Sequence, residues 1–486
     1  MHYRAILHIL GAILVFLGLS MFLSLFWSVY YQEPDFYPIL KSILITVSLG
    51  VLLFVFTRSK HIELSTRDGF AIVTSAWFIT AVFSALPGFL SGAIPTYTDS
   101  FFEAMSGLTT TGASILGHPS TNLIENLPHG ILFWRSFTHF IGGMGIIVFS
   151  IAILPLLGFG GVQLFRAEVA GPVADKLTPR VKQTAKYLWG IYVGFVLVET
   201  LILKLEGMSL FDSLCHSFGT MATGGFSTKT ASIGYFNSPM IEWTIIFFMF
   251  AAATNFSLHF SALSYRKIRY FKDAEFKFYF GLILFLSIII TLNISQNIYG
   301  WKLENFRHAA FTTVSLITST GFGTEDFETW PPLSKTIVFF MLFIGGSAGS
   351  TTGALKIIRT VLVLKFLAVE IRRLIHPKGV FLLTIGGNVV PDNVVNNTLG
   401  FYLFYIFIFV VTSFLFSSMG IDLVSATTAS ASALGNMGPG LGSIGPSENW
   451  GHFPVLAKWI ASFCMLLGRL EIFTITVLFS RSFWRQ

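Results

Sequence analysis

Four short polar stretches hold the residues whose chemistry stands out in this chain. Each places small polar residues before a glycine between two apolar runs. Glycine lets successive backbone carbonyls turn the same way, and a ring of such carbonyls can replace the water shell of a metal cation. The stretches therefore predict a cation-selective filter. The predicted filter residues are Thr110, Thr111 and Gly112, then Ala222, Thr223 and Gly224, then Ser319, Thr320 and Gly321, and finally Asn436, Met437 and Gly438.

One such stretch alone is better explained by a glycine that lets two helices pack closely. The recurrence is what favours a filter. Taking Gly112, Gly224, Gly321 and Gly438 as equivalent, the stretches repeat at intervals of roughly 110 residues. Four stretches in register predict four quarters of one site.

A short helix is predicted before each stretch. The sequence offers helix start signals at Thr98 or Asp99, Ser209, Asn305 and Asp422. About eleven residues of helix are roughly 16 Å long, which is about half the thickness of a bilayer. Each half-helix would point its carbonyl end, the negative end of its dipole, toward the membrane centre. Four converging helix ends favour a cation.

The composition requires a membrane around these elements. The chain has 486 residues, of which 53% are hydrophobic and 11% charged, and its mean hydropathy is +0.72. These values predict an all-α polytopic membrane protein. Ten transmembrane helices are predicted, at about 5–29, 38–57, 70–92, 129–158, 187–203, 239–264, 278–296, 334–355, 397–418 and 454–480.

Basic residues set the predicted orientation. Most of the 31 Lys and Arg residues fall in loops on the side of the N-terminus, which predicts cytoplasmic N- and C-termini. The glycine stretches then enter and leave the membrane on the outer side. We expect two extra helices at 1–66, followed by four repeats of helix, pore half-helix, filter loop and helix at 67–165, 166–270, 271–380 and 381–486.

Two further features lie on the cytoplasmic side of the predicted filter. The eighth predicted span is interrupted by a segment rich in glycine and hydroxyl residues, which fits either close helix packing or an intramembrane loop. Arg469 lies near the middle of the last predicted span and should face a cavity or a partner. Glu471 is on another side of that helix, and Arg135 is expected to reach the headgroups. The predicted gate residues are Gly345, Gly346, Ser347, Gly349, Ser350, Thr351, Thr352, Gly353 and Arg469.

Local runs throughout the chain resemble the Trk/Ktr/HKT superfamily of potassium transporters, and most closely its TrkH branch. These runs are Trp-Arg-Ser-Phe at 134–137, Gly-Gly-Met-Gly at 142–145 and Lys-Leu-Thr-Pro-Arg at 176–180. The resemblance implies one pore with pseudo-fourfold symmetry in a bacterial cytoplasmic membrane, closed by the segment around 344–353 together with Arg469. It also implies a homodimer embedded in lipid and gated by a cytoplasmic TrkA-type nucleotide-binding ring.

The sequence thus predicts potassium uptake, with potassium as the substrate and no cofactor on this chain. A nucleotide such as ATP, ADP or NAD would act only through the ring, and no nucleic-acid partner is expected. In some members of this family a serine at the first filter glycine accompanies sodium permeation, whereas this chain has Gly112. A sodium or mixed alkali-cation pathway is the alternative within transport. A membrane enzyme lacks a catalytic cluster here, and a scaffold leaves the four matched stretches unexplained.

Overall fold

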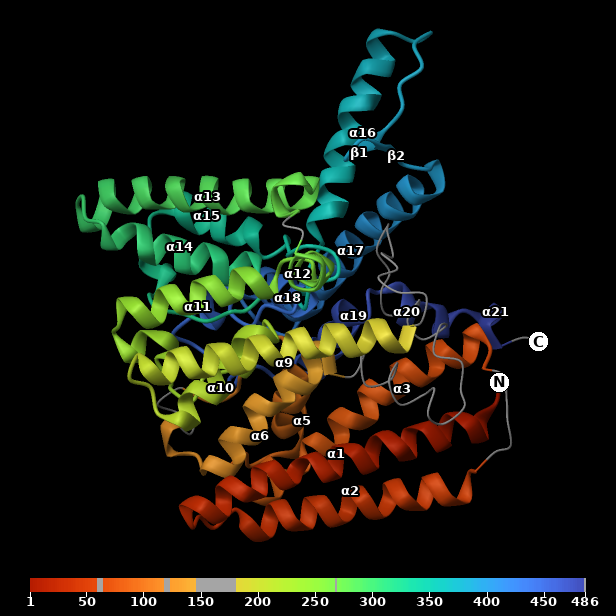
Figure 1. Cartoon of the computed structure of the whole chain (residues 1–486), viewed down its shortest axis with the longest axis vertical. Helices are drawn as coiled ribbons and strands as arrows, with labels where there is room; N and C mark the ends of the chain where they lie inside the picture. Colours follow the sequence, from red (N-terminus) through yellow and green to blue (C-terminus); the bar gives the residue numbers. More distant parts are fainter. Residues whose placement is uncertain (59–63, 118–122, 146–180, 267–268, 485–486) are drawn as a thin grey trace.

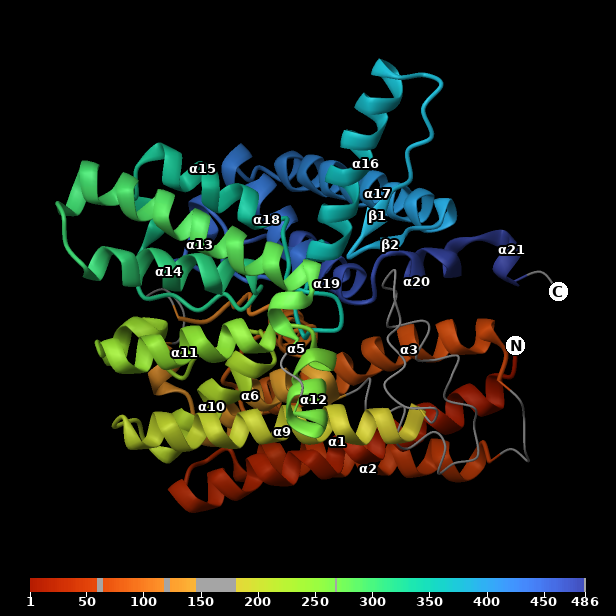
Figure 2. The ribbon, with the colours of Figure 1, turned by 45° about the horizontal axis from the view of Figure 1, so that its top comes forward.

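The structure is a computed structural model that describes residues 1–58, 64–117, 123–145, 181–266 and 269–484. The motif at 176–180 and the predicted boundary at 165/166 lie outside the described residues. Long apolar helices run side by side through the body of the molecule (Figures 1 and 2). Met1 and the C-terminal helix α21 (Arg481–Trp484) lie at the same end of this bundle (Figure 1).

Among the described residues, six helices are long and apolar enough to cross a membrane, or up to eight if each of two bent pairs counts as one span. These six match predicted windows because their runs are long and continuously apolar. They comprise α1 (Tyr3–Tyr31), α2 (Phe36–Phe56), α3 with α4 (Thr66–Ser84, Leu86–Leu90), α9 (Val181–Leu205), α13 with η5 (Ala274–Ile294, Ser295–Tyr299) and α17 (Asp392–Ser418).

The other four predicted windows do not hold one long helix in the described residues. The break within 334–355 was predicted, those within 239–264 and 454–480 were not, and the part of the window 129–158 after Gly145 lies outside the described residues. Each holds a helix of ten to fifteen residues that ends where a polar or glycine-rich segment begins. The helices are α6 (His129–Phe140), α11 (Pro239–Ala252), α15 (Pro332–Met341) and α19 (Val455–Arg469).

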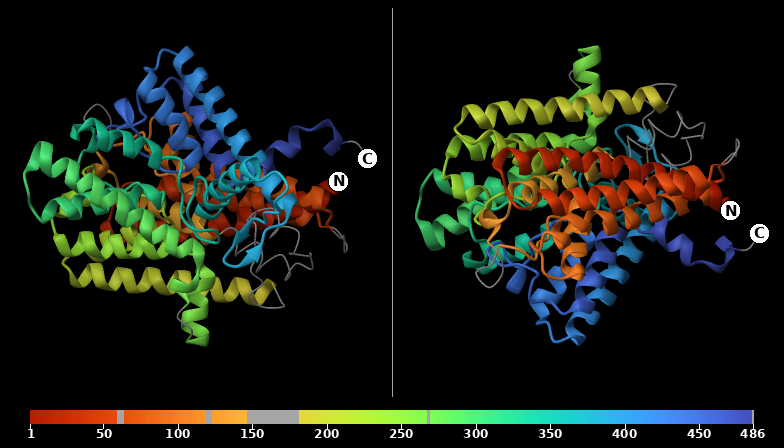
Figure 3. Two further views of the ribbon diagram at one scale, coloured as in Figure 1. Left: turned by 90° about the horizontal axis from the view of Figure 1, so that it is seen from above. Right: turned by 90° about the horizontal axis from the view of Figure 1, so that it is seen from below.

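The chain leaves these helices in different ways. A π-helical turn, η2 (Ile141–Gly145), comes directly after α6. Helix α11 bends by 97° into α12 (Phe256–Tyr265), which projects from the bundle (Figure 3). The bend occurs where the Asn255 side chain caps α12 by accepting from Ser257 N at 2.8 Å. Helix α19 bends by 107° into α20 and η8 (Phe473–Thr476, Val477–Phe479).

Four half-length helices of 12 to 14 residues form as predicted, with some corrections at their starts. Ser209 and Asp422 are side-chain caps as expected. The first half-helix is capped by Thr96, not by Thr98 or Asp99, and the third begins at Glu304 without a side-chain cap, so Asn305 is not its start signal. The half-helices are α5 (Tyr97–Leu108), α10 (Leu210–Met221), α14 (Glu304–Ile317) and α18 (Leu423–Gly435).

Helix α16 (Ile357–Ile375) extends away from the bundle (Figure 1). A two-stranded antiparallel hairpin, β1 (Thr384–Ile385) with β2 (Asn388–Val389), connects it to α17. The remaining elements are short 3-10 turns: η1 (Ile124–Asn126), η3 (Ser232–Phe236), η4 (Tyr270–Lys272), η6 (Phe327–Thr329) and η7 (Gly442–Ile444).

Candidate functional site

The four loops after the half-helices share the same backbone path. In each, one residue in the left-handed region (φ 51 to 55°) is followed two residues later by a glycine with φ between 78 and 84°. Only glycine adopts such angles without a steric cost, which explains why each loop contains one. The pairs are Thr110 with Gly112, Thr223 with Gly225, Ser319 with Gly321, and Asn436 with Gly438.

This pattern corrects the predicted register of the second loop. The residue equivalent to Gly112 is Gly225, and Gly224 occupies the middle position instead. Ala222 is the C-terminal cap of α10, so it precedes the repeated turn. Two adjacent glycines in the sequence offered two alignments, and only the backbone angles distinguish them.

The residue in the middle of each loop is fixed in the same way. Its backbone N–H donates to the carbonyl five residues earlier, near the end of the preceding half-helix, at 2.8 to 3.1 Å. These four bonds satisfy helix-end carbonyls that would otherwise be unpaired inside the protein. The bonds join Thr111 to Ser106, Gly224 to Gly219, Thr320 to Ser315, and Met437 to Ser432.

The loops contact one another in a closed cycle. Each positive-φ glycine packs so tightly against the middle carbonyl of the next loop that a Cβ atom there would lie under 3.0 Å from the carbonyl oxygen. The fourth loop makes this contact with the first, so the cycle closes. In order, the contacts are Gly112 with Gly224 O, Gly225 with Thr320 O, Gly321 with Met437 O, and Gly438 with Thr111 O.

A buried ion pair links residues at the ends of the first two loops. Arg135 Nε donates to Glu103 Oε1 at 2.6 Å, and both side chains are about 5% exposed. Glu103 also accepts from Ser114 Oγ and from Ile115 N, just beyond the first loop. Arg135 Nη1 donates to Ser227 O of the second loop. The prediction that Arg135 reaches the headgroups is therefore wrong, because a carboxylate within the bundle satisfies its charge.

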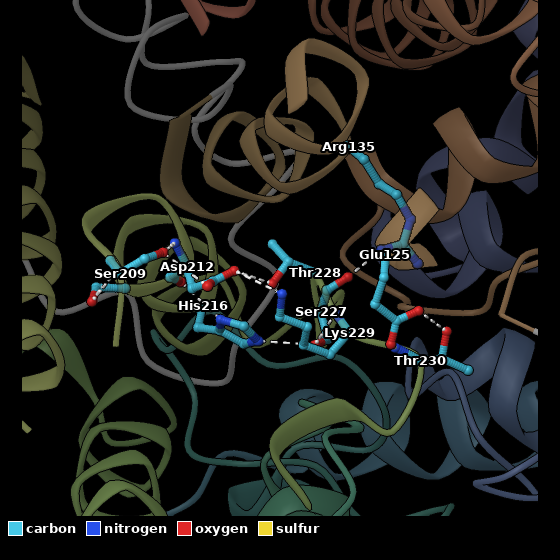
Figure 4. Close-up of polar contacts among 10 residues, drawn as sticks. Glu125, Arg135, Ser209, Asp212, His216, Ser227, Thr228, Lys229 and Thr230 are labelled. Carbon is cyan, nitrogen blue, oxygen red and sulfur yellow. Dashed lines mark hydrogen bonds and ion pairs between the residues drawn. The ribbon is translucent and has the colours of Figure 1, made fainter. Parts of the chain in front are cut away.

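Polar side chains also hold the segment after the second loop (Figure 4). Asp212 and His216 lie on one face of α10 and point toward this segment. His216 Nε2 is 2.9 Å from Ser227 Oγ, and Thr228 Oγ1 donates to the Asp212 carboxylate at 2.5 Å. Lys229 Nζ is 3.8 Å from the same carboxylate. The loop is thus tied to the helix that precedes it.

Glu125, in η1, links this segment to the connection between α5 and α6 (Figure 4). Its carboxylate accepts from Thr230 N at 2.8 Å and from Thr230 Oγ1 at 2.6 Å. Burial by itself would raise the pKa of the Glu125 carboxyl, but the Thr230 hydrogen bonds and the charge of Lys229 hold that pKa below its ordinary value. The two hydrogen bonds from Thr230 need the ionised carboxylate, which accepts one bond on each oxygen.

The glycine-rich connection between α15 and α16, residues 342–356, lies against the C-terminal ends of α10 and α11. Thr351 Oγ1 is within hydrogen-bond distance of Met221 O, at the end of α10, and of Ala252 O, at the end of α11. Gly353 N donates to Ser319 Oγ of the third loop at 2.8 Å. The sequence allowed either close helix packing or a loop for this segment. The structure shows a loop, because no continuous helix crosses it.

Hydrogen bonds within this connection give it a folded shape. A parallel bridge pairs Ile344 with Leu355 where the two limbs meet. The predicted gate residues lie between these limbs: Gly345 N donates to Leu355 O, Gly346 N to Thr352 Oγ1, Ser347 N to Ala253 O, and Ser350 Oγ to Ser347 O, while Gly349 O accepts from Phe256 N.

Arg469 is the last residue of α19 and lies at the 107° bend within the last predicted span. Its Nη1 donates to Thr351 O at 2.8 Å, and its Nη2 donates to Gly142 O at 2.6 Å and to Gly143 O at 2.9 Å. The guanidinium thus joins the 342–356 connection to the π-helical turn after α6. Glu471 pairs with Arg359, as expected for a residue that is not the partner of Arg469.

Glu275 ties the same connection to the first turn of α16 and was missed in the sequence. Its Oε1 accepts from Ala348 N at 2.8 Å and from Ile358 N at 3.0 Å. Glu275 occupies the first turn of α13 and is 7% exposed. The sequence signal is an acidic residue at the start of an apolar helix, which is usually a simple helix-terminus charge.

The described residues contain no group of three or more His, Cys, Asp or Glu side chains that could hold a metal ion. The oxygens that the loops bring together are backbone carbonyls. Carbonyl oxygens at the negative ends of helices suit a weakly bound alkali cation better than a transition metal, which prefers nitrogen and sulfur.

The comparisons with known proteins agree with this architecture. A family model described as TrkH, cation transport protein, matches residues 37–486. The chain belongs to the TrkH family. The "Trk system potassium uptake protein TrkH" of Halomonas elongata is 42% identical and that of Salmonella typhimurium is 40% identical, each with 100% of both chains covered.

The likeness extends to a solved TrkH structure. The crystal structure of the potassium transporter TrkH from Vibrio parahaemolyticus matches with a TM-score of 0.89 and 36% identity, covering 100% of both chains. The chain is therefore a membrane transporter of a cation transport family, mostly helical and with several membrane-spanning helices, rather than an enzyme.

Proposed function

We propose that this chain takes up potassium across the bacterial cytoplasmic membrane through a filter built by its four loops. The observation that carries the proposal is the closed cycle in which each positive-φ glycine packs on the middle carbonyl of the next loop. A cycle of four loops, each at the negative end of a half-helix, surrounds one axis with carbonyl oxygens. The names of the TrkH relatives, which are potassium uptake proteins, support potassium as the substrate.

The corrected filter residues are Thr110–Gly112, Thr223–Gly225, Ser319–Gly321 and Asn436–Gly438. We propose that they belong to four pseudo-symmetric repeats and that ten helices cross the membrane, with each interrupted helix completing its crossing through the segment after its break. The common end of the bundle that holds Met1 and α21 is then cytoplasmic (Figure 1). The distribution of Lys and Arg supports this orientation.

The 342–356 connection and Arg469 form the proposed gate. The connection touches the ends of α10 and α11 and the third filter loop, so it blocks the way from the filter to the cytoplasm. Its backbone is irregular and glycine-rich, and irregular backbone at membrane depth is tolerated only inside protein or beside a wet path. Displacement of this connection would open the path.

We further propose a homodimer controlled by a cytoplasmic TrkA-type ring, in keeping with the family resemblance. An exposed apolar stripe on α16 supports a protein contact on this side, because soluble surfaces rarely carry such stripes. Its residues recur with the three-four spacing of a helix seam: Leu364, Leu367, Ile371 and Leu374, each more than half exposed. Any nucleotide would bind to the ring.

The test is cation flux through the purified protein in liposomes, measured for potassium and for sodium. Gly112→Ser should lower the potassium preference, because a side chain at φ 78° that points at Gly224 O must open the cycle. Gly194→Ser is the matched control, since a Cβ atom at Gly194 in α9 has no neighbour within 4 Å. An unchanged preference in Gly112→Ser would refute the filter.

The same flux assay separates the alternatives. A sodium or mixed-cation transporter would carry sodium as well as potassium in competition experiments, and a scaffold would carry neither. Addition of a cytoplasmic ring partner, with and without nucleotide, tests the proposed control. A ring that leaves the flux unchanged would refute it.

A further inference from the structure

Gly224 is unusual among the four middle residues of the loops because it has no side chain. The other three middle residues are Thr111, Thr320 and Met437. In the first and third loops a hydroxyl pair stiffens the turn: Thr109 Oγ1 and Thr111 Oγ1 are 2.8 Å apart, and Thr318 Oγ1 and Thr320 Oγ1 are 2.7 Å apart. The second loop has Ala222 and Gly224 at these two places, so it cannot make this bond.

The side chain of His139, from α6, occupies the space behind the second loop. A Cβ atom on Gly224 would lie 2.5 to 2.7 Å from three atoms of the imidazole. The ring is fully buried and lies against the Phe226 ring, with centroids 4.2 Å apart. The φ of Gly224 is not in the left-handed region, so the backbone there would accept any residue. The three atoms nearest to that Cβ position all belong to the imidazole, which leaves no room for a side chain at position 224.

Both ring nitrogens of His139 are used. Phe226 N donates to Nε2 at 3.1 Å, which leaves the proton on Nδ1, and Nδ1 donates to Gly107 O at 2.8 Å. The first partner comes after Gly224 and Gly225 in the second loop, and the second lies in the last turn of α5 before the first loop. The neutral imidazole therefore joins the second loop to the last turn of the half-helix that leads into the first loop, and Gly112 of that first loop packs on Gly224 O.

We propose that His139 is a specificity-determining positioning residue that replaces, from a neighbouring helix, the side chain missing at Gly224. This inference rests on the proposed filter. It assigns to the imidazole the task of holding the Gly224 carbonyl at the position that the threonine pairs give to the carbonyls of the first and third loops. Cation preference depends on the positions of the coordinating carbonyl oxygens, so it should change when His139 is replaced.

Moving the side-chain volume from position 139 to position 224 tests this inference directly, by cation flux measured in liposomes. His139→Ala and Gly224→Thr should each lower the potassium-to-sodium flux ratio by about tenfold, the first by leaving the loop without support and the second by forcing the ring and the loop apart. The double variant His139→Ala with Gly224→Thr should recover the ratio to within about threefold of the wild type, because one side chain again fills the space. His139→Gln, which keeps a donor and an acceptor without the ring, should fall between.

The controls separate this inference from the filter itself. His8→Ala removes another buried histidine, which bonds Phe54 O in α2, and should leave the flux ratio unchanged. If His139→Ala and His139→Gln both keep the wild-type ratio while Gly112→Ser lowers it, the role of His139 is refuted and the filter stands. If Gly112→Ser also has no effect, the filter is refuted. If the double variant has a potassium-to-sodium flux ratio no higher than that of the single variants, the proposal that the His139 ring replaces a side chain at position 224 is refuted.

Discussion

Replacing Arg469 with alanine should raise the resting potassium flux without changing the preference among cations. The guanidinium joins the 342–356 connection, through Thr351 O, to the π-helical turn after α6, through Gly142 O and Gly143 O. Movement of the connection must break the bond to Thr351. The filter loops make none of these three bonds, so the cation preference should survive.

The size of the effect can be worked out from that one bond. A hydrogen bond from a charged donor contributes about 1.5 to 3 kcal/mol. Because about 1.4 kcal/mol is a tenfold change in an equilibrium, loss of the bond to Thr351 should shift the ratio of open to closed protein by about 10-fold to 100-fold. Removal of the fixed positive charge beside the path would add to this increase.

The assay is potassium flux into liposomes containing the purified protein, without a cytoplasmic partner. Arg469→Lys separates the two contributions: an ammonium keeps the charge but cannot match the planar fork that reaches three carbonyls. If the carbonyl contacts close the path, the lysine variant should behave like the alanine variant. If the charge closes it, the lysine variant should resemble the wild type. Arg373→Ala, on the half-exposed face of α16, is the control and should leave flux unchanged.

A resting flux in Arg469→Ala equal to that of the wild type would refute the reasoning, provided that both proteins elute as the same species. So would a rise in flux accompanied by loss of cation preference, because it would mean that the arginine supports the filter rather than the gate.

Three further outcomes are expected. Glu275→Ala should also raise the resting flux, because it frees Ala348 of the 342–356 connection and the first turn of α16, and unchanged flux would contradict this. Arg135→Ala should destabilise the protein by about 3 to 5 kcal/mol by leaving Glu103 buried and unpaired, measured as a lower melting temperature in detergent; a shift no larger than that of an exposed arginine would argue against it. Glu125→Gln should lower the melting temperature slightly at neutral pH, by about 1 kcal/mol or less, because the carboxylate is partly exposed. Since the folded pKa of Glu125 is below its ordinary 4.5, this difference should be present above pH 4.5 and disappear as the pH falls through the folded pKa, and a pH-independent difference would refute it.

The sequence predicted the long helices and the half-helices well because their signals are local. Uniform apolar runs such as α1 and α17 can only be spans, and Ser209 and Asp422 begin their helices through their own side chains. The bends within 239–264 and 454–480 were missed because a hydropathy window averages over them. The run at 239–264 stays apolar across Asn255, although that residue caps a helix in a new direction.

The candidate site was predicted in composition but not in register or support. Two adjacent glycines, Gly224 and Gly225, fit the repeat equally well until backbone angles are known. Arg135 resembles an interfacial arginine in the sequence because its partner Glu103 is 32 positions away. His139 stands among apolar residues, and nothing in its neighbourhood along the chain indicates that it supports a loop nearly ninety residues later.

The cycle of loop contacts is built by one chain, so a substitution enters it once. In an assembly of four identical subunits the same substitution would enter four times. Here the middle positions can be changed one at a time or in combination, and transport can be measured as a function of how many of the four loops are altered. The same property leaves room for divergence: a residue as unlike threonine as Met437 occupies one quadrant while Thr111 and Thr320 retain hydroxyls in two others. One loop can therefore change its sequence while the other three keep theirs, and each loop can acquire a separate role.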